Sequence, residues 1–366
     1  MLKIIGIHFK RLTVPLKTPF KTAVRSVDCL DDLVVILKTD GELSGFGSAP
    51  STPMITGETH QTIETVIKSH IFPAIKDNPI DAIDVNCRHT QNAIVGNASA
   101  KAAVEIALYD LWSKYLGLPL YKALGGTVSE LKTDYTISAN SLDTMINDCN
   151  LAIDAGYDCL KLKIGTDFKS DKLALQHLYK QFAGKATLRL DVNQGWSEAQ
   201  TIQALSEFER DGIEFELVEQ PVAADNINGM ISIAREINTP IMADESCKSL
   251  NDVSMILANK AADIINIKLM KCGGISTAIN IAKLTNEYGK AAMMGCMLEG
   301  SISVAAAAHL AAAYSREIKL VDLDGPTLGK YDPIMSDQQN RVNSATFFET
   351  SNIKLNQTPG LGIIAV

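Results

Sequence analysis

Charged residues that end apolar, strand-like segments are the feature of this sequence that points most directly to chemistry. Such segments recur in the middle of the chain at intervals of about 24 to 30 residues, the length that a strand and its following helix require. The charged residues that end them are Lys161 and Lys163, Asp191, Glu219, Asp244 and Lys268. A charge in such a place is costly if it is buried alone. Successive parallel strands would bring these charges together around one axis, with three carboxylates flanked by amines on both sides.

The three acidic residues of this series predict a metal site. Asp191, Glu219 and Asp244 end three consecutive predicted strands, and no His ends a strand of the series. Oxygen ligands alone suit a hard cation such as Mg²⁺, for which Mn²⁺ can substitute. The sequence therefore predicts a magnesium site whose protein ligands are these three carboxylates.

The lysines of the series predict acid/base chemistry. Lys161 and Lys163 are two residues apart on one strand, so both side chains point to the same face and each lowers the pKa of the other by repulsion. Lys163 lies nearer the strand end and is assigned the role of base, while Lys161 tunes it and binds a substrate oxygen. Lys268 ends the sixth predicted strand, which lies opposite the second in a ring of eight. A metal-held carboxylate substrate between them would lose its α-proton to one lysine and regain it from the other.

Eight strand patterns that alternate with helical patterns are predicted to position these residues. The predicted strands are residues 133–138, 158–164, 187–191, 215–219, 241–244, 264–268, 291–294 and 319–322. No GxGxxG motif follows a first strand, so the pattern favours a closed (β/α)₈ barrel of the modified TIM type over an open doubly wound sheet. In such a barrel the carboxyl ends of the strands meet at one active site.

Chain of a different pattern flanks the predicted barrel. Residues 1 to about 50 alternate with a period of two and contain the turn TDGE, which predicts a hairpin, and residues 60 to 120 show helical periodicity. We therefore predict an α+β capping domain over residues 1–125 and the catalytic barrel over 126–324. A C-terminal segment over 325–366 is predicted to pack back on the capping domain.

Composition and charge argue against several functional classes. The formal net charge is −8, so repulsion from phosphate disfavours a nucleic acid or an anionic membrane as partner. The seven Cys are scattered without CxxC spacing, which predicts free thiols in a reducing compartment. The start MLKIIGIHFK reads as a strand and lacks the apolar stretch of a signal peptide, so we expect a cytoplasmic enzyme.

The segments KLKIG, DVNQGW, VEQP, ADES and INIKLMKCGGI occur in the order typical of one enzyme family. On these motifs the chain resembles the enolase superfamily, and specifically its muconate-lactonizing subgroup, over essentially its whole length. The resemblance implies a modified TIM barrel with an N-terminal capping domain, a Mg²⁺ site and a homo-oligomer. The subgroup contains cycloisomerases, o-succinylbenzoate synthases, N-acylamino acid racemases and dipeptide epimerases, which share the metal and the lysines.

The substrate-contacting segments favour the dipeptide epimerases. Asp322 and Asp324 end the eighth predicted strand on one face, and the resemblance implies that this DxD holds the N-terminal ammonium of a dipeptide. Two carboxylates would also repel a dicarboxylate such as muconate. Arg25, in the early loop FKTAVRSV, matches a carboxylate side chain by a bidentate pair, as in the L-Ala-D/L-Glu epimerases of peptidoglycan turnover. Further predicted contacts are Ile55, Thr136, Cys296 and Met297, with Thr22 and Glu299 in the same loops.

The resulting expectation is a Mg²⁺-dependent isomerase that interconverts L-Ala-L-Glu and L-Ala-D-Glu, with a small-molecule dipeptide as its binding partner. The alternatives within the subgroup use the same metal and lysines but give no reason for the DxD. A non-catalytic barrel that binds dipeptides is the alternative from another class. Such a protein would not need Lys163 and Lys268 on opposite faces of its ligand.

Overall fold

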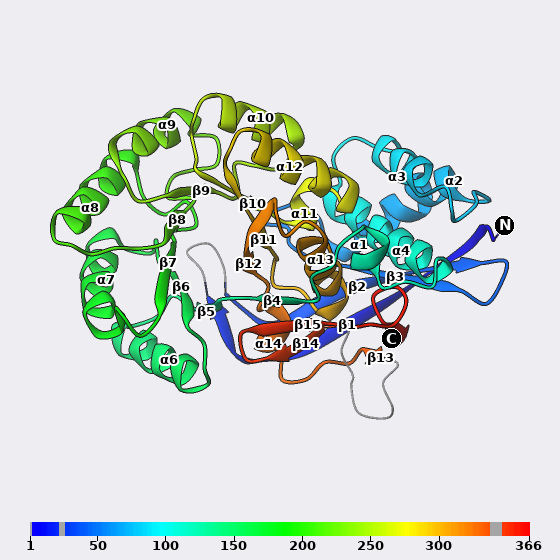
Figure 1. Ribbon diagram of the computed structural model, residues 1–366, viewed down its shortest axis with the longest axis horizontal. Coiled ribbons are helices and arrows are strands. Elements are labelled where there is room, and N and C mark those ends of the chain that lie inside the picture. Colours follow the sequence, from blue (N-terminus) through cyan, green and yellow to red (C-terminus); the bar gives the residue numbers. More distant parts are fainter. Residues whose placement is uncertain (1, 22–25, 337–345) are drawn as a thin grey trace.

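The computed structural model describes residues 2–21, 26–336 and 346–366, and its largest element is a barrel of eight parallel strands (Figure 1). The strands follow one another around the barrel in sequence order. They are β5 (Tyr135–Ile137), β6 (Cys159–Lys163), β7 (Thr187–Asp191), β8 (Leu217–Glu219), β9 (Ile241–Ala243), β10 (Ile264–Ile267), β11 (Ala291–Gly295) and β12 (Ile318–Asp322). All eight predicted strands and the predicted (β/α)₈ barrel are therefore confirmed.

Helices cover the outer face of the barrel and connect successive strands (Figure 1). Several begin at a residue whose side chain accepts a hydrogen bond from the first turn, as Ser141, Asp167, Ser197 and Ser249 do. The helices are α6 (Leu142–Asp154), α7 (Phe168–Phe182), α8 (Glu198–Arg210), α9 (Ile227–Glu236), α10 (Leu250–Ala258), α11 (Leu269–Cys272), α12 (Ile275–Glu287) and α13 (Ser301–Ala313). Within the described residues, no helix combines the length and apolar character needed to cross a bilayer.

The period of two along each strand separates an inner from an outer set of barrel side chains. Leu217, Met242 and Ile264 form a small apolar cluster of their own, while their strand neighbours Val218 and Ile241 join the main core against the helices. Counting by two from this inner set reaches Glu219, Asp244 and Lys268. The same alternation that packs the barrel interior therefore turns the charged strand ends toward the barrel axis.

Side-chain hydrogen bonds join the first and last strands of the barrel. The backbone N–H of Leu323 donates to Thr133 Oγ1 at 2.8 Å, and that of Thr136 donates to Asp324 Oδ2 at 2.7 Å. Arg189 lies inside the barrel, where it donates to Asp134 Oδ2 at 2.7 Å. These bonds hold β5 beside β12 and so complete the ring.

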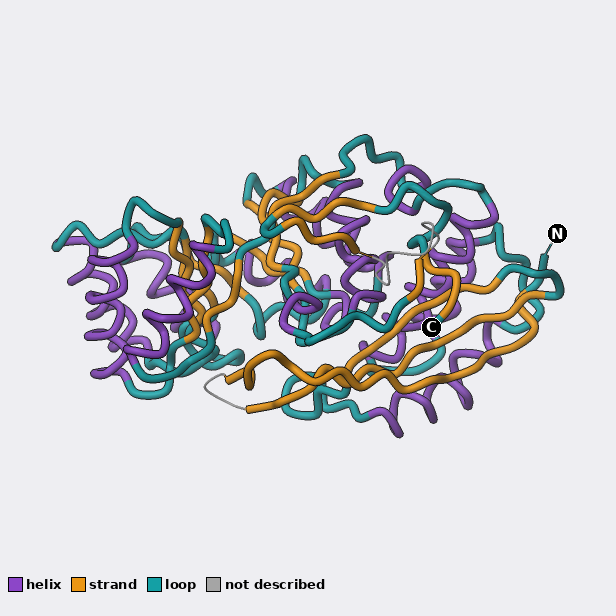
Figure 2. Tube along the Cα trace, turned by 90° about the horizontal axis from the view of Figure 1, so that it is seen from below, coloured by secondary structure: helices purple, strands orange, loops and turns teal. Residues whose placement is uncertain are grey.

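The N-terminal part of the chain is an antiparallel sheet covered by helices (Figures 1 and 2). Its elements are β1 (Ile4–Lys21), β2 (Ser26–Thr39), β3 (Ser44–Pro50), α1 (His60–Val66), the π-helical turn Ile67–Ile71, α2 (Phe72–Ile75), α3 (Ile83–Asn92), α4 (Ala98–Tyr115) and α5 (Leu120–Ala123). The predicted hairpin turn TDGE joins β2 to β3. Helix α4 packs so closely on β3 that a Cβ at Gly47 would lie 2.0 Å from the carbonyl oxygen of Ala103.

The C-terminal part of the chain contacts β1 and α4 of the N-terminal part and pairs with the short strand before the barrel. It contains α14 (Gly325–Leu328), β13 (Met335–Ser336), β14 (Thr346–Glu349), β15 (Asn352–Leu355) and β16 (Ile363–Ala365), and β15 pairs with β4 (Glu130–Lys132). The backbone N–H of Lys330 donates to Pro15 O at 2.9 Å, and that of Leu361 to Asp110 Oδ1 at 2.7 Å. The division of the chain at residues 125 and 324 stays a prediction.

Glu105 links the N-terminal helices to the barrel. It lies on α4 with no exposed surface, and its carboxylate accepts from Gln91 Nε2 at 2.7 Å and from the backbone N–H and the hydroxyl of Ser276 at 2.8 and 2.7 Å. Ser276 lies in the first turn of α12. A carboxylate on one part of the chain thus caps a helix of the other part.

We expect Glu105→Ala to lower the free energy of unfolding by about 2–4 kcal/mol, because several buried donors lose their acceptor at once. Chemical denaturation followed by circular dichroism measures this change. Glu105→Gln keeps one acceptor oxygen and should lose less stability than the alanine variant. Equal stability of wild type and Glu105→Ala would show that this contact does not hold the two parts together.

Candidate active site

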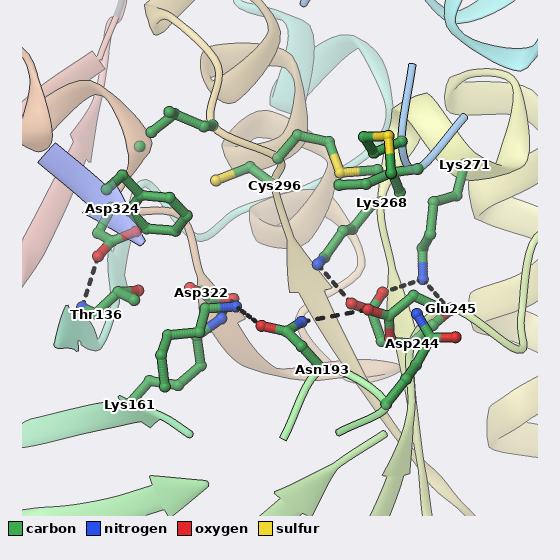
Figure 3. A pocket seen from close by; sticks show the side chains of 18 of the residues that line it. Thr136, Lys161, Asn193, Asp244, Glu245, Lys268, Lys271, Cys296, Asp322 and Asp324 are labelled. Atoms are coloured by element: carbon green, nitrogen blue, oxygen red, sulfur yellow. Dashed lines mark hydrogen bonds and ion pairs between the residues drawn. The ribbon is translucent and has the colours of Figure 1, made fainter. Parts of the chain in front are cut away.

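A polar cavity of about 240 Å³ lies at the carboxyl ends of the barrel strands (Figure 3). In the paired strands β6, β7 and β8, Lys163 lies beside Asp191 and Asp191 beside Glu219. Asp244 directly follows β9, and Lys268 directly follows β10. The structure therefore brings together the whole charged series that the sequence singled out, and all of its members are buried.

Lys161 and Lys163 point to the same face of β6, as predicted. Lys163 Nζ donates to Asp191 Oδ2, and Lys161 Nζ lies 3.7 Å from both Asp191 Oδ2 and Glu219 Oε2. Lys161 Nζ also donates to Asp322 Oδ2. Burial by itself would lower the pKa of Lys161, but the carboxylates of Asp322 and Glu219 raise it well above its usual range. The expected lowering of the Lys161 pKa by Lys163 is therefore wrong, because nearby carboxylates outweigh the repulsion between the two amines.

Lys268 reaches the cavity from a different side than Lys161 of β6 (Figure 3). Its Nζ donates to Asp244 Oδ2 at 2.8 Å and lies 4.0 Å from Glu219 Oε1. Although burial opposes the charged form, these two carboxylates raise the pKa of Lys268 above its usual range. Lys268 and Lys271 in turn lower the pKa of Asp244, against the effect of burial.

The carboxylates have the chemistry of a site for a hard divalent cation. Glu219 has no exposed surface, and its Oε2 has no hydrogen-bond partner within the described residues. Burial and the charges of Asp191 and Asp244 raise the pKa of Glu219 well above its usual range. Buried acids that repel one another need a cation among them, so Asp191, Glu219 and Asp244 fit Mg²⁺ as an all-oxygen donor set.

Lysine side chains pair with these acids in the structure. Among the described residues, no three His, Cys, Asp or Glu side chains converge into a ready-made metal cage. The ammonium groups of Lys161, Lys163 and Lys268 lie against the acids instead. A divalent cation would therefore have to compete with lysine for carboxylate oxygens.

Asp322 and Asp324 lie on the opposite side of the cavity from Asp244 and Lys271 (Figure 3). The two aspartates differ in charge state, because Lys161 lowers the pKa of Asp322 to about 2 against the effect of burial. Burial and repulsion by Asp322 raise the pKa of Asp324 to about 6. Near neutral pH both are carboxylates, which suits a cationic ligand group.

Four of the other predicted substrate contacts line the cavity. Ile55, Thr136, Cys296 and Met297 all line it, and the Met297 N–H donates to the buried Glu299 Oε1 at 2.7 Å. Arg25 and Thr22 lie outside the described residues.

Three residues that the sequence argument did not single out support the charged series. Asn193 bridges two acid/base groups, since its Oδ1 accepts from Lys163 Nζ at 3.0 Å and its Nδ2 donates to Glu245 Oε1 at 3.2 Å. Gln220 Oε1 accepts from the backbone N–H groups of Asp244 and Ser246 at 2.9 and 3.1 Å.

The third is Lys271, which is 4% exposed and donates to the side chain of Asp244 and to its backbone oxygen at 2.5 Å. The sequence contained one signal for these residues, because each lies close to a charged strand end. Asn193 is two residues after Asp191, Gln220 directly follows Glu219, and Lys271 is three residues after Lys268. Asn193 and Gln220 also have positive φ angles of 45° and 34°, which are uncommon outside glycine and cluster at functional sites.

Family models match both parts of the chain. Residues 5–125 match the N-terminal domain of mandelate racemase and muconate lactonizing enzyme, and residues 144–364 match the enolase C-terminal domain-like family. These matches agree with the N-terminal sheet and helices and with the barrel that the structure shows.

Individual relatives are similar over nearly the whole chain. The L-Ala-D/L-Glu epimerase of Clostridium acetobutylicum is 46% identical, with 96% of each chain covered. A solved substrate-liganded complex of the L-Ala-D/L-Glu epimerase from Bacillus subtilis has a TM-score of 0.94 at 39% identity, with 99% of each chain covered. The dipeptide epimerase from Enterococcus faecalis V583, solved with Mg and L-Leu-L-Tyr, has a TM-score of 0.92 at 32% identity and covers 99% of this chain and 100% of its own. The chain therefore belongs to the mandelate racemase and muconate lactonizing enzyme family of the enolase superfamily.

Proposed function

We propose that this protein is a Mg²⁺-dependent dipeptide epimerase that interconverts L-Ala-L-Glu and L-Ala-D-Glu. The single observation that carries the proposal is the placement of Lys163 and Lys268 at the ends of the second and sixth barrel strands, on opposite sides of buried carboxylates. The similarity to L-Ala-D/L-Glu epimerases over nearly the full length supports the same activity.

Two lysines on opposite faces of one α-carbon explain an inversion of configuration. One lysine, as the neutral amine, removes the α-proton of the second residue, and the other, as the ammonium, delivers a proton from the opposite face. A cation bound to Asp191, Glu219 and Asp244 supplies positive charge for the substrate carboxylate and neutralises the acids that raise the pKa of Lys268. Lys161 remains beside the acids as a fixed positive charge for a substrate oxygen.

Asp322 and Asp324 provide the feature that distinguishes dipeptides from other substrates of this family. Two carboxylates at the end of β12 pair with the N-terminal ammonium of a dipeptide and repel a dicarboxylate. A cycloisomerase or an o-succinylbenzoate synthase has no positive substrate group for them, and an N-acylamino acid racemase acts on a blocked amine. The carboxylate pair therefore favours the dipeptide epimerase over these alternatives.

Proton NMR of L-Ala-L-Glu with the protein and Mg²⁺ in D₂O tests this proposal directly. We expect the Glu α-proton signal to disappear while signals of L-Ala-D-Glu appear. Absence of α-proton exchange in any dipeptide, with magnesium-loaded and folded protein, would refute the proposed function. Exchange with succinylbenzoate or muconate substrates instead would identify one of the alternatives.

We expect Asp324→Asn to raise KM for L-Ala-L-Glu at least about tenfold, because loss of a charge-assisted contact costs about 1.5–3 kcal/mol. In the wild-type protein, KM for L-Ala-L-Glu should itself rise as the pH falls below about 6, since protonation then removes the charge of Asp324. The variant should lack this pH dependence. Steady-state kinetics between pH 5 and 8 (about the range in which the protein is expected to stay folded) measures both effects.

Asp211→Asn, which changes an exposed carboxylate after α8, serves as the control and should behave as wild type. If KM for Asp324→Asn stays at the wild-type value, the substrate amine binds elsewhere. A role in peptidoglycan turnover and a homo-oligomeric state are part of the same proposal and follow from the sequence resemblance. A cytoplasmic location is also part of it and follows from the scattered cysteines without CxxC spacing.

A further inference from the structure

The motifs KLKIG and DVNQGW both end in residues that lie outside the active-site cavity. Gly165 comes two residues after Lys163, and Trp196 comes three residues after Asn193. Lys163 and Asn193 line the cavity, whereas Gly165 and Trp196 do not. The two later residues instead meet at a side chain of α7, the helix that connects β6 to β7 on the outer face of the barrel (Figure 1). Substrate contact therefore does not explain these two positions.

The side chain at which they meet is the carboxylate of Asp171, in the first turn of α7. It is 6% exposed, and its Oδ2 accepts from the backbone N–H of Gly165 at 2.9 Å and from the indole N–H of Trp196 at 3.1 Å. A buried carboxylate is costly unless hydrogen bonds satisfy it. Because these two donors come from the loop after β6 and the loop after β7, one acceptor ties both loops to the same helix.

The two loops also touch each other directly through glycines. Gly165 has a φ angle of 98°, and a Cβ on it would lie 2.1 Å from the backbone oxygen of Val192. A Cβ on Gly195 would lie 2.2 Å from the backbone oxygen of Gly165. Only glycine fits at such distances. Since the backbones are in contact, a displacement of one loop has to move the other.

These loops hold one of the two lysines assigned to proton transfer. Lys163 ends β6, directly before the first loop, and its Nζ donates at 3.0 Å to Oδ1 of Asn193, which lies in the second loop. Lys268 differs in this respect. Within the described residues, no hydrogen bond of Asp171 reaches β10 or the turn that follows Lys268. The contacts of Asp171 therefore bear on Lys163 and not on Lys268.

We propose that Asp171 is a positioning residue for Lys163, which holds the two loops so that the amine of Lys163 is directed at one face of the substrate α-carbon. This inference rests on the proposed epimerase function and deepens it. Asp171 does not line the cavity, so its effect on the reaction has to pass through Lys163 and Asn193. The competing view is that Asp171 only stabilises the fold, in which case its loss would affect both lysines alike.

Exchange of the α-proton in D₂O, started separately from L-Ala-L-Glu and from L-Ala-D-Glu, reports on each lysine by itself. The quantity measured is the initial rate at which the Glu α-proton signal is lost, at saturating substrate and Mg²⁺. The epimer that Lys268→Ala still exchanges is the one that Lys163 deprotonates. The rate for this epimer is divided by the rate for the other epimer. A general loss of stability or of metal binding lowers both rates and leaves this ratio unchanged.

Three variants test the contact from both sides. Asp171→Ala removes the acceptor, and Asp171→Asn keeps one acceptor oxygen. Trp196→Phe removes only the indole donor and keeps an aromatic ring against Phe168, whose ring centroid lies 5.5 Å from that of Trp196. Asp167→Ala is the matched control, because Asp167 is the exposed N-cap of the same helix and bonds the backbone N–H of Ser170 instead of the two loops.

We expect Asp171→Ala to lower the ratio about tenfold or more, since a small displacement of a reacting group costs up to about 10²-fold in rate. Trp196→Phe should lower the ratio by a smaller factor, and Asp171→Asn should keep most of it. Asp167→Ala should leave the ratio unchanged even though loss of the N-cap lowers the thermal midpoint.

An unchanged ratio in folded Asp171→Ala, or in Trp196→Phe if the alanine variant does not fold, would overturn the assignment and leave the epimerase function intact. A wild-type protein that exchanges the α-proton of neither epimer would overturn both.

Discussion

Lys268→Ala is expected to lower the rate of epimerisation of L-Ala-L-Glu by about 10²–10⁴-fold, while the α-proton of one epimer still exchanges with solvent. Inversion needs a proton donor on the face opposite to the base, and Lys268 at the end of β10 lies four strands around the barrel from Lys163 at the end of β6. The remaining lysine can still remove a proton and return one to the same face. Proton NMR in D₂O, started separately from each epimer, distinguishes exchange from inversion.

Lys163→Ala is the matched variant for this prediction. It should also stop epimerisation, but it should retain exchange for the epimer that Lys268→Ala has lost. Exchange of both epimers in either variant, or of neither epimer in both variants, would contradict independent roles for the two lysines. Asp244 keeps its contact with Lys271 in Lys268→Ala, so thermal unfolding should show a folded protein.

Glu219→Gln should abolish measurable Mg²⁺ binding and activity and yet stabilise the metal-free protein. Glu219 is a buried acid whose Oε2 has no hydrogen-bond partner among the described residues, and its neighbours Asp191 and Asp244 add repulsion. A neutral amide removes that unfavourable charge and keeps an acceptor oxygen for Asn266 Nδ2, which now lies 2.7 Å from Oε1. We expect a gain of about 1–3 kcal/mol in the free energy of unfolding in the presence of a chelator.

The pH dependence of stability gives a second measurement on the same variant. Burial raises the pKa of Glu219 in the folded state, so the folded protein binds this proton more tightly than the unfolded chain does. The stability of the metal-free wild type should therefore fall as the pH rises above the ordinary pKa of glutamate, and this fall should be smaller in Glu219→Gln. Urea denaturation at several pH values measures the difference.

Glu216→Gln is a control on the same strand segment. Glu216 lies just before β8, at the other end of the barrel, where it pairs with Arg189. This variant should leave Mg²⁺ affinity unchanged in isothermal titration calorimetry. Wild-type Mg²⁺ affinity in Glu219→Gln, or a loss of stability in the metal-free variant, would remove Glu219 from the metal site.

The proposed metal site also explains why lysines form ion pairs with these acids. In the structure Lys163 and Lys268 pair with the acids, and Lys161 lies 3.7 Å from two of them. A buried ammonium paired with a carboxylate is a poor base, because the ion pair raises its pKa, as it does for Lys268. Acid/base activity of the lysines is therefore expected to depend on occupation of the metal site. This dependence links the predicted effects of Lys268→Ala and Glu219→Gln.

The sequence by itself determined the barrel and the identity of its charged strand ends. Strands with apolar flanks occur at regular intervals, and a period of two assigns each residue to the inside or the outside. The residues Asp191, Glu219 and Lys268 could therefore be placed at one end of the barrel without a structure. Strand spacing and the period of two depend only on residues within one strand and the helix that follows it, so they can be read from the sequence.

Only the tertiary structure decided which groups touch and how their charges balance. Lys271 reaches Asp244 from the turn after β10, and Gln220 holds the backbone of the same loop from the end of β8. The raised pKa of Lys161 depends on Asp322, which is 161 residues away in the sequence. Such pairings depend on distances between side chains of different strands and loops, which neither strand periodicity nor motif spacing contains.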